Sequence, residues 1–119
     1  MLNPEAEKFF LERSARDEAG TAVIEALKKC GEYDLRGDLR VCKSPYAVTA
    51  GRVFCGAAGM QDTFWRLRPS DRAIALACGA QETPLGPDWV RIELFRPDWP
   101  RPDLEHWALK AYHFARTGK

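Results

Sequence analysis

The segment 85–116 constrains the fold most, because a strand pattern in it is followed directly by a helix pattern. Within residues 89–95, apolar and charged side chains alternate with a period of two, which predicts a strand with one buried face. The apolar positions are Val90, Ile92 and Leu94. We expect these three side chains to point inward against the last helix.

Residues 102–116 carry apolar side chains at helical spacing, which predicts an amphipathic helix that begins near Pro102. His106 and His113, the two histidines of the chain, lie two helical turns apart on it, with Lys110 between them. Two histidines at this spacing, with a lysine between them, are poorly placed to bind one zinc ion. We therefore expect solvent-facing histidines and no metal site. The expected inward face consists of Leu104, Trp107, Ala108, Ala111, Phe114 and Ala115.

Three further helices are predicted upstream. The first begins at Asn3-Pro4, where asparagine can cap the helix and proline suits its first position, and it ends or bends at Gly20. Thr21 then caps a second helix, and Ser70 caps a shorter third helix.

Between the helices, short apolar or alternating runs predict strands within 39–43, 46–56, 63–68 and 89–95, and the gap 80–87 leaves room for one more strand or a loop. Short turns between most strands favour a small, mostly antiparallel sheet with helices packed on one side, an α+β fold. The expected order is helix, three strands, helix, two strands, helix, plus an extra N-terminal helix.

Weak apolar periodicity sets residues 1–20 apart as an N-terminal helical extension, so we expect residues 21–119 to form a single α+β domain. The 18 Lys and Arg residues nearly balance the 17 Asp and Glu residues, and neither half of the chain is a basic arm. The start of the chain lacks the pattern of a secretion signal, and no apolar run is long enough to span a bilayer. We therefore expect a cytoplasmic protein without a membrane partner.

Four cysteines, Cys30, Cys42, Cys55 and Cys78, are too far apart for a Cys-x-x-Cys motif, and we interpret them as reduced structural thiols. The sequence contains no nucleophile elbow, phosphate loop or dinucleotide-binding fingerprint. We therefore expect no catalytic residue, no cofactor and no enzymatic activity.

Several short segments together resemble the MmcQ/YjbR-like family of small bacterial proteins, over about three-quarters of the chain from Val23 onward. The resemblance implies a fold of helix, three strands, helix, two strands and helix, to which the N-terminal helix is an addition. Members of this family are often described as DNA-binding, which the resemblance would extend to this chain. The matching segments are 51–54, 65–69, 86–94, 98–99 and 111–112.

Basic and aromatic residues near the predicted strands form a candidate interaction surface. Trp89 shares a strand face with Arg91, so it is either a lid over the core edge or an exposed anchor. Trp99, between two prolines, is interpreted first as a pin for the link to the last helix, and an interface role comes next. The full candidate set is Arg66, Arg68, Trp89, Arg91 and Trp99.

Three functions stay open at this point. The first is a protein-interaction module. One form of it is a homodimer that uses the outer sheet face or the added N-terminal helix. The second is DNA or RNA binding through arginines and tryptophans of the sheet, which nearby acidic residues disfavour. The third is a small-molecule pocket between the sheet and the last helix, involving Cys55 or His113.

Overall fold

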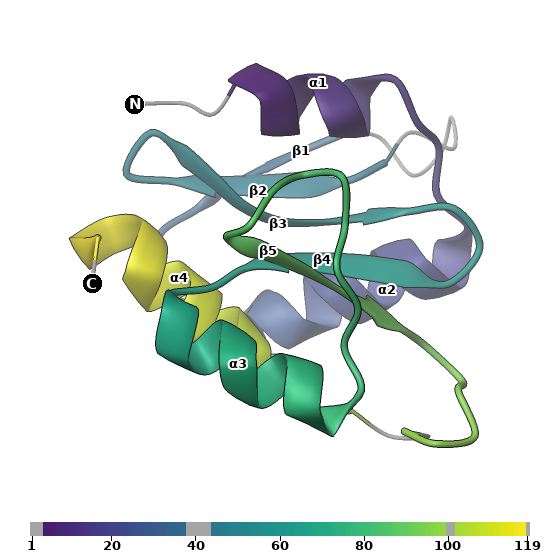
Figure 1. The fold of residues 1–119 in the computed structure, drawn as a ribbon. Coiled ribbons are helices and arrows are strands. Elements are labelled where there is room, and N and C mark those ends of the chain that lie inside the picture. The colour runs from purple at the N-terminus through teal and green to yellow at the C-terminus, as the bar shows by residue number, and fades with distance from the viewer. Residues whose placement is uncertain (1–3, 38–43, 100–101, 119) are drawn as a thin grey trace.

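The computed structural model describes residues 4–37, 44–99 and 102–118, and in them five strands and four α-helices form an α+β fold. Figure 1 shows the arrangement. In chain order the elements are α1 (Pro4–Leu11), α2 (Asp17–Ala26), the 3-10 turn η1 (Leu27–Lys29), β1 (Asp34–Arg36), β2 (Tyr46–Thr49), β3 (Arg52–Ala58), β4 (Asp62–Arg66), α3 (Pro69–Cys78), β5 (Trp89–Glu93) and α4 (Leu104–Thr117).

The five strands form one antiparallel sheet in the order β1-β2-β3-β4-β5. The expected α+β class is confirmed, but the expected division of the strands is wrong: four strands precede α3 and one follows it. In the gap 80–87 only Gln81 pairs with β5, through two backbone hydrogen bonds of 2.8 Å with Arg91. One such bridge is too short to count as a strand. The strand predicted at 39–43 lies outside the described residues.

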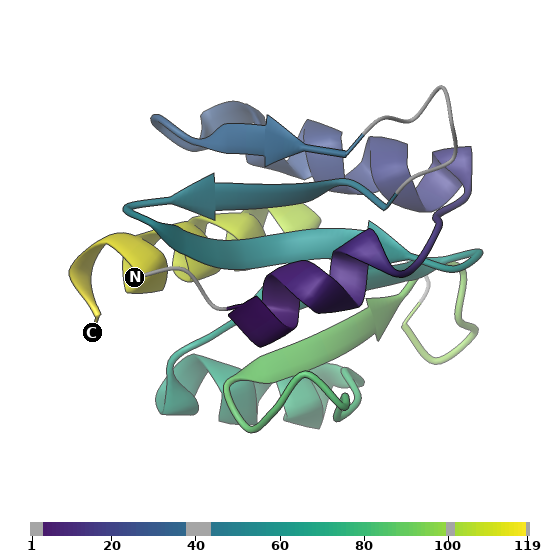
Figure 2. The same cartoon turned by 90° about the horizontal axis from the view of Figure 1, so that it is seen from above.

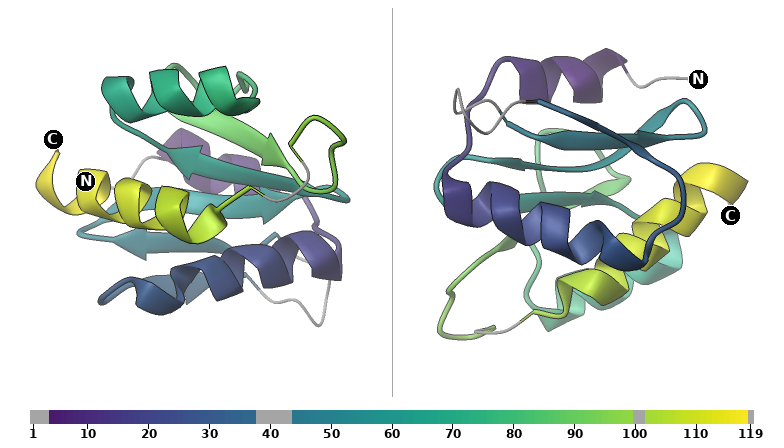
Figure 3. Two further views of the ribbon diagram at one scale, coloured as in Figure 1. Left: turned by 90° about the horizontal axis from the view of Figure 1, so that it is seen from below. Right: turned by 180° about the vertical axis from the view of Figure 1, so that it is seen from behind.

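Three helices, α2, α3 and α4, cover one side of the sheet, which we call the three-helix face (Figure 3). Val90 and Ile92 are fully buried there in one cluster with Trp107 and Ala111 of α4, as the alternation of β5 predicts. Leu94 is buried as well. Burial of these apolar side chains is the main source of stability for the sheet and the last helix.

The inward face of α4 differs from the prediction at two positions. Tyr112 is buried although the prediction did not include it, and its ring centroid lies 5.9 Å from that of Phe54. Phe114 is only partly buried, whereas Leu104 packs against the three-helix core as expected. The helix begins one residue after Asp103, whose side chain accepts a hydrogen bond from the backbone N–H of His106.

Helix α1 lies on the opposite side of the sheet, which we call the α1 face, so helices cover both sides rather than one (Figure 2). Phe10 is fully buried against β3, where Gly56 leaves room for its ring: a Cβ atom on Gly56 would lie 2.5 Å from that ring. Glu7 holds the helix to the sheet edge by accepting hydrogen bonds from Arg36 at 2.7 Å and Tyr46 at 2.9 Å. The first residues of the chain thus contribute a second, smaller core.

The helix boundaries near residue 20 and residue 70 also differ from those expected. Gly20 lies inside α2, and its N–H donates to the carbonyl of Arg16 at 3.1 Å, so Gly20 neither ends a helix nor leaves Thr21 to cap one. Helix α2 therefore passes through the expected boundary at residue 20. Helix α3 begins at Pro69, with Ser70 already inside it.

Strand β3 contains a β-bulge, which reverses the direction in which the side chains of its N-terminal end point. The register with β2 shifts at Ala47/Val48, which leaves Phe54 as an extra residue opposite them. Phe54 and the following Cys55 consequently both belong to the three-helix core. Ala50 and Gly51 both have positive φ, as a two-residue hairpin turn requires.

Candidate functional site

The residues of the expected interaction surface fall into separate environments. Trp89 is only 3% exposed and belongs to the core under α1, with its ring centroid 6.1 Å from that of Phe10. It therefore covers the core rather than serving as an exposed anchor. Trp99 is half-buried and packs against the three-helix core beside Gly79, where a Cβ atom would lie 3.1 Å from its ring.

Arg66 and Arg68 lie where β4 ends and α3 begins. The guanidinium carbon of Arg66 is 4.4 Å from the centroid of the Phe114 ring, and the Nη2 atom of Arg66 is 3.6 Å from Oδ2 of Asp88. Burial lowers the pKa of Arg66 below its ordinary value, an effect that Asp88 opposes. The Nε of Arg68 donates to Asp71 at 2.7 Å.

Most arginines near β4, β5 and α3 have an acidic neighbour, which leaves little free positive charge on this part of the surface. A phosphate-binding surface needs cations that are free to replace counterions, and paired arginines are poor candidates. The ion pairs are Arg66–Asp88, Arg68–Asp71, Arg72–Glu82, Arg91–Glu93 and Arg96–Asp98.

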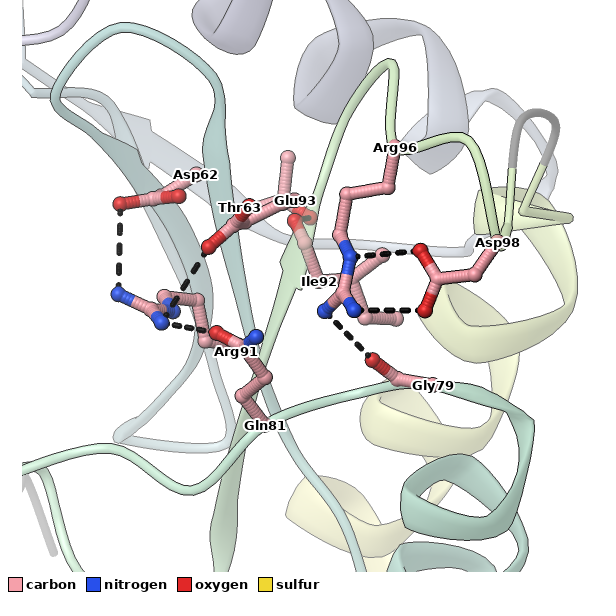
Figure 4. Close-up of polar contacts among 9 residues, drawn as sticks. All are labelled: Asp62, Thr63, Gly79, Gln81, Arg91, Ile92, Glu93, Arg96 and Asp98. Atoms are coloured by element: carbon pink, nitrogen blue, oxygen red, sulfur yellow. Dashed lines mark hydrogen bonds and ion pairs between the residues drawn. The ribbon is translucent and has the colours of Figure 1, made fainter.

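Arg91 is the centre of a charged cluster on the α1 face (Figure 4). Its guanidinium donates to the side-chain oxygen of Gln81 and lies 3.3 Å from Glu93 and 3.9 Å from Asp62. Asp62 and Glu93 are directly opposite each other in the β4–β5 register, so two carboxylates share one guanidinium. Burial raises the pKa of Asp62 above its ordinary value; Arg91 opposes the shift and Glu93 adds to it.

A cleft of about 540 Å³ opens beside this cluster, between α1, the strand β4 and the loop that precedes β5. The aromatic rings of Phe9 and Phe64 lie 5.2 Å apart and form its apolar part. Arg13 also lines the cleft, with its guanidinium carbon 3.6 Å from the centroid of the Phe9 ring. Polar and apolar groups thus converge in one concave site, which is the usual composition of a small-molecule site.

A second feature lies at the same end of the sheet, in the turn after β5. Phe95 is 70% exposed and has a φ of 64°, a left-handed conformation that is unfavourable for a bulky residue. Met60, in the turn between β3 and β4, is 69% exposed. Together with Arg16, Glu18 and Gln61, these two residues line a shallow hollow of about 250 Å³.

The turn that carries Phe95 is held on both sides. Before it, the N–H of Leu94 donates to the carbonyl of Gln61 at 2.8 Å. After it, Arg96 donates two hydrogen bonds to Asp98, at 2.9 and 2.6 Å, and a third to the carbonyl of Gly79 at 3.2 Å (Figure 4). The exposed ring is therefore presented by a fixed turn.

The cleft and the Phe95 turn are neighbours because the chain passes around this end of the sheet on its way from α1 to α2. Two backbone hydrogen bonds join that link to the β3–β4 turn: Gly59 donates to the carbonyl of Ser14 at 2.7 Å, and Arg16 donates to the carbonyl of Gly59 at 2.8 Å. Residues 59 and 62 line the cleft, and residues 60 and 61 line the hollow beside Phe95.

Cysteines and histidines lie apart from this region. Cys55 is fully buried and Cys30 half-buried, and burial raises the pKa of both thiols, that of Cys30 to about 11. Cys78 is exposed, and Cys42 lies outside the described residues. His106 and His113 are exposed on α4, and within 4–37, 44–99 and 102–118 no group of three potential metal ligands occurs.

The sequence carried weak signals for both features. Adjacent phenylalanines at 9 and 10 did not indicate that one ring enters the core while the other lines a cleft. The left-handed turn at Phe95 was not expected, because glycine or asparagine usually occupies such a position. Arg96, directly after Phe95, puts a charged residue beside an aromatic one and is the hint that the sequence offers.

Comparison of the chain with family models, with curated proteins and with solved structures gives no match. In the part of the chain that the structure describes, no helix has the length and apolar character needed to cross a bilayer.

Proposed function

We propose that this protein is a non-catalytic protein-interaction module that binds a second copy of itself through the Phe95 turn. The observation that carries the proposal is the exposed ring of Phe95, held in an unfavourable backbone conformation by a network of hydrogen bonds. Strained residues that their surroundings hold in place are concentrated at functional sites. Exposed aromatic residues beside arginine are also typical of interface hot spots.

A second copy is the occupant that the charges around the turn favour. Arg16 and Glu18 line the hollow beside Phe95, and within the described residues neither forms an ion pair. An isologous interface uses the same surface twice, so a two-fold axis beside the turn would place Arg16 and Glu18 of both copies in one interface, where the opposite charges can pair. Each copy would offer one ring and one hollow to receive the ring of its partner.

The test is sedimentation velocity on the wild-type chain and on Phe95→Asn. Asparagine tolerates the left-handed conformation, so this change removes the ring without disturbing the turn. We expect the wild-type chain to dimerise between about 1 µM and about 1 mM, and Phe95→Asn to weaken the dimer at least about tenfold, as loss of a hot-spot residue does.

Ile74→Asn is the matched control, because Ile74 is also an exposed apolar residue but lies on α3. It should leave the dissociation constant unchanged. A wild-type chain that stays monomeric throughout the concentration range would contradict the proposal, and so would equal effects of the two substitutions.

The resemblance to MmcQ/YjbR-like proteins, with the DNA-binding role that it implies, is a separate proposal that rests on sequence motifs. The paired arginines give nucleic-acid binding no additional support. Its test is a band-shift assay at low salt, in which phosphate contacts would show as an affinity that falls steeply as salt is added.

A further inference from the structure

The cleft beside α1 carries an inference that does not depend on self-association. We propose that it binds a small zwitterion with an apolar body, of the kind that a free amino acid with an aromatic or aliphatic side chain represents. The apolar part of the cleft would receive the body, and two oppositely charged sides would receive the ammonium and carboxylate groups.

The negative side is the cluster on β4 and β5. One guanidinium, that of Arg91, is shared by Asp62 at 3.9 Å and Glu93 at 3.3 Å, so the three groups carry a surplus of negative charge. Asp62 is the carboxylate of this cluster that lines the cleft, and Arg91 lines it as well. The long distance to Arg91 leaves Asp62 able to accept hydrogen bonds from an ammonium group, which brings three donors and a positive charge.

The positive side is Arg13, in the link after α1. The Nη1 atom of Arg13 donates to the carbonyl of Phe9 at 3.0 Å, and within the described residues Arg13 forms no ion pair. Its guanidinium carbon lies 3.6 Å from the centroid of the Phe9 ring, which keeps the group beside the cleft. A guanidinium held in this way matches the two oxygens of a carboxylate.

The apolar body has its place between these two sides. Phe9 and Phe64 come from α1 and β4, on either side of the cleft, and their rings meet edge to face. An aromatic or aliphatic side chain placed against them would lose contact with water, and that burial drives binding in addition to the charge contacts. A ligand with only one charge would contact only one of the two groups, Arg13 or Asp62.

Three probes separate the parts of this proposal: L-phenylalanine, 3-phenylpropanoate, which lacks the ammonium, and phenethylamine, which lacks the carboxylate. Each is titrated into the ¹⁵N-labelled protein at neutral pH while amide shifts are followed. We expect L-phenylalanine to bind about fivefold more tightly than either analogue, the upper range for one half-exposed ion pair. The shifts should concentrate at residues 13–14, 59 and 62–64.

Two substitutions identify which side chain binds the carboxylate of the ligand and which binds its ammonium group. Arg13→Gln should abolish the advantage of L-phenylalanine over phenethylamine, and Asp62→Asn should abolish its advantage over 3-phenylpropanoate. Glu25→Gln and Lys28→Gln are the matched controls. Both residues are exposed and lie outside the cleft, Glu25 in α2 and Lys28 in η1. They should leave all three affinities unchanged.

Equal binding of the three probes would overturn the zwitterion class, and the absence of shifts around the cleft with any probe would overturn the site. Circular dichroism is used to confirm that each variant is folded before its affinities are compared with those of the wild-type chain. Phe95→Asn distinguishes this proposal from self-association, since it should bind L-phenylalanine as the wild-type chain does.

Discussion

The two faces of the sheet are covered differently, and the difference separates structure from function. On the three-helix face, α2, α3 and α4 lie over the sheet (Figure 3). They enclose a continuous apolar cluster that includes Trp65 and Trp107. On the α1 face, one helix packs on a smaller aromatic cluster and leaves a cleft beside it. The first face carries the larger core, with a hollow of about 320 Å³ between α2 and the start of α4. The second combines a smaller core with the cleft.

The number of helices accounts for this contrast. The single helix α1 is about 10 Å across with its side chains, whereas five strands spaced about 4.8 Å apart make a sheet roughly 19 Å wide. One short helix cannot cover that width, so part of β4 and β5 on this face is left to charged side chains. Asp62, Arg91 and Glu93 occupy that uncovered part.

The largest expected effect comes from replacing a buried aromatic side chain of β4 by alanine, on one face of the sheet and then on the other. Trp65→Ala, on the three-helix face, should lower the free energy of unfolding by about 3–5 kcal/mol, the range for a fully buried large aromatic residue. Phe64→Ala, on the α1 face, should cost less, about 2 kcal/mol, because its surroundings open into the cleft and can relax. Urea denaturation measures both. Equal losses would remove the distinction between the faces.

A smaller effect is expected where α1 docks. Gly56→Ala places a methyl group in contact with the ring of Phe10 and should cost about 1–3 kcal/mol through overpacking. Hydrogen exchange should show the loss in α1 while α2 and α4 keep their protection. In a Phe10→Ala background the same change should cost little. A full cost in that background would mean that Gly56 serves a purpose other than room for the ring.

The charged cluster of the α1 face predicts a pH effect smaller than about 1 kcal/mol, since both partners are partly exposed. Asp62 has a raised pKa when the protein is folded, so the folded state holds its proton to higher pH than the unfolded state does. Its contribution to stability therefore declines as pH rises from the unfolded pKa through the folded one.

Thermal unfolding of Asp62→Asn against the wild-type chain isolates this contribution. The stability of the wild-type chain relative to Asp62→Asn should fall as pH increases through that window. A difference that is constant with pH, or one that grows in favour of the wild-type chain, would be inconsistent with burial as the main cause of the shift.

The smallest effect concerns a turn that belongs to neither core. Ala50 has a φ of 51° at the first position of the β2–β3 hairpin turn and is exposed. Ala50→Asn should raise the free energy of unfolding by about 0.5 kcal/mol, because Asn-Gly is the preferred pair for this turn. The gain should appear equally in probes of both faces. A gain limited to one face would show that the two unfold separately.

Periodicity predicted the three-helix face well, because it depends on local repeats. Val90 and Ile92 alternate, and α4 repeats its apolar residues at helical spacing, so both inward faces could be identified from adjacent positions. The α1 face depends instead on contacts between residues far apart in the chain. Phe10 needs the missing side chain of Gly56, which no local pattern reveals.

The sequence did not predict the order of the strands or the turn at Phe95, and the reasons are related. The single bridge at Gln81 leaves the segment before β5 without a strand, although its composition allowed one. Phe95 adopts a positive φ because Leu94 and Arg96 are fixed on either side by long-range hydrogen bonds. Backbone strain imposed by tertiary contacts does not appear in a single sequence.

One measurement tests the central claim most directly: an amide chemical-shift map of the ¹⁵N-labelled wild-type chain as its concentration rises from about 20 µM to about 1 mM. We predict shifts that are confined to the end of the sheet around Arg16, Met60 and Phe95, with α2 and α4 beyond that end unchanged. A map that does not change with concentration, or one in which the shifts fall on α4, would contradict the account.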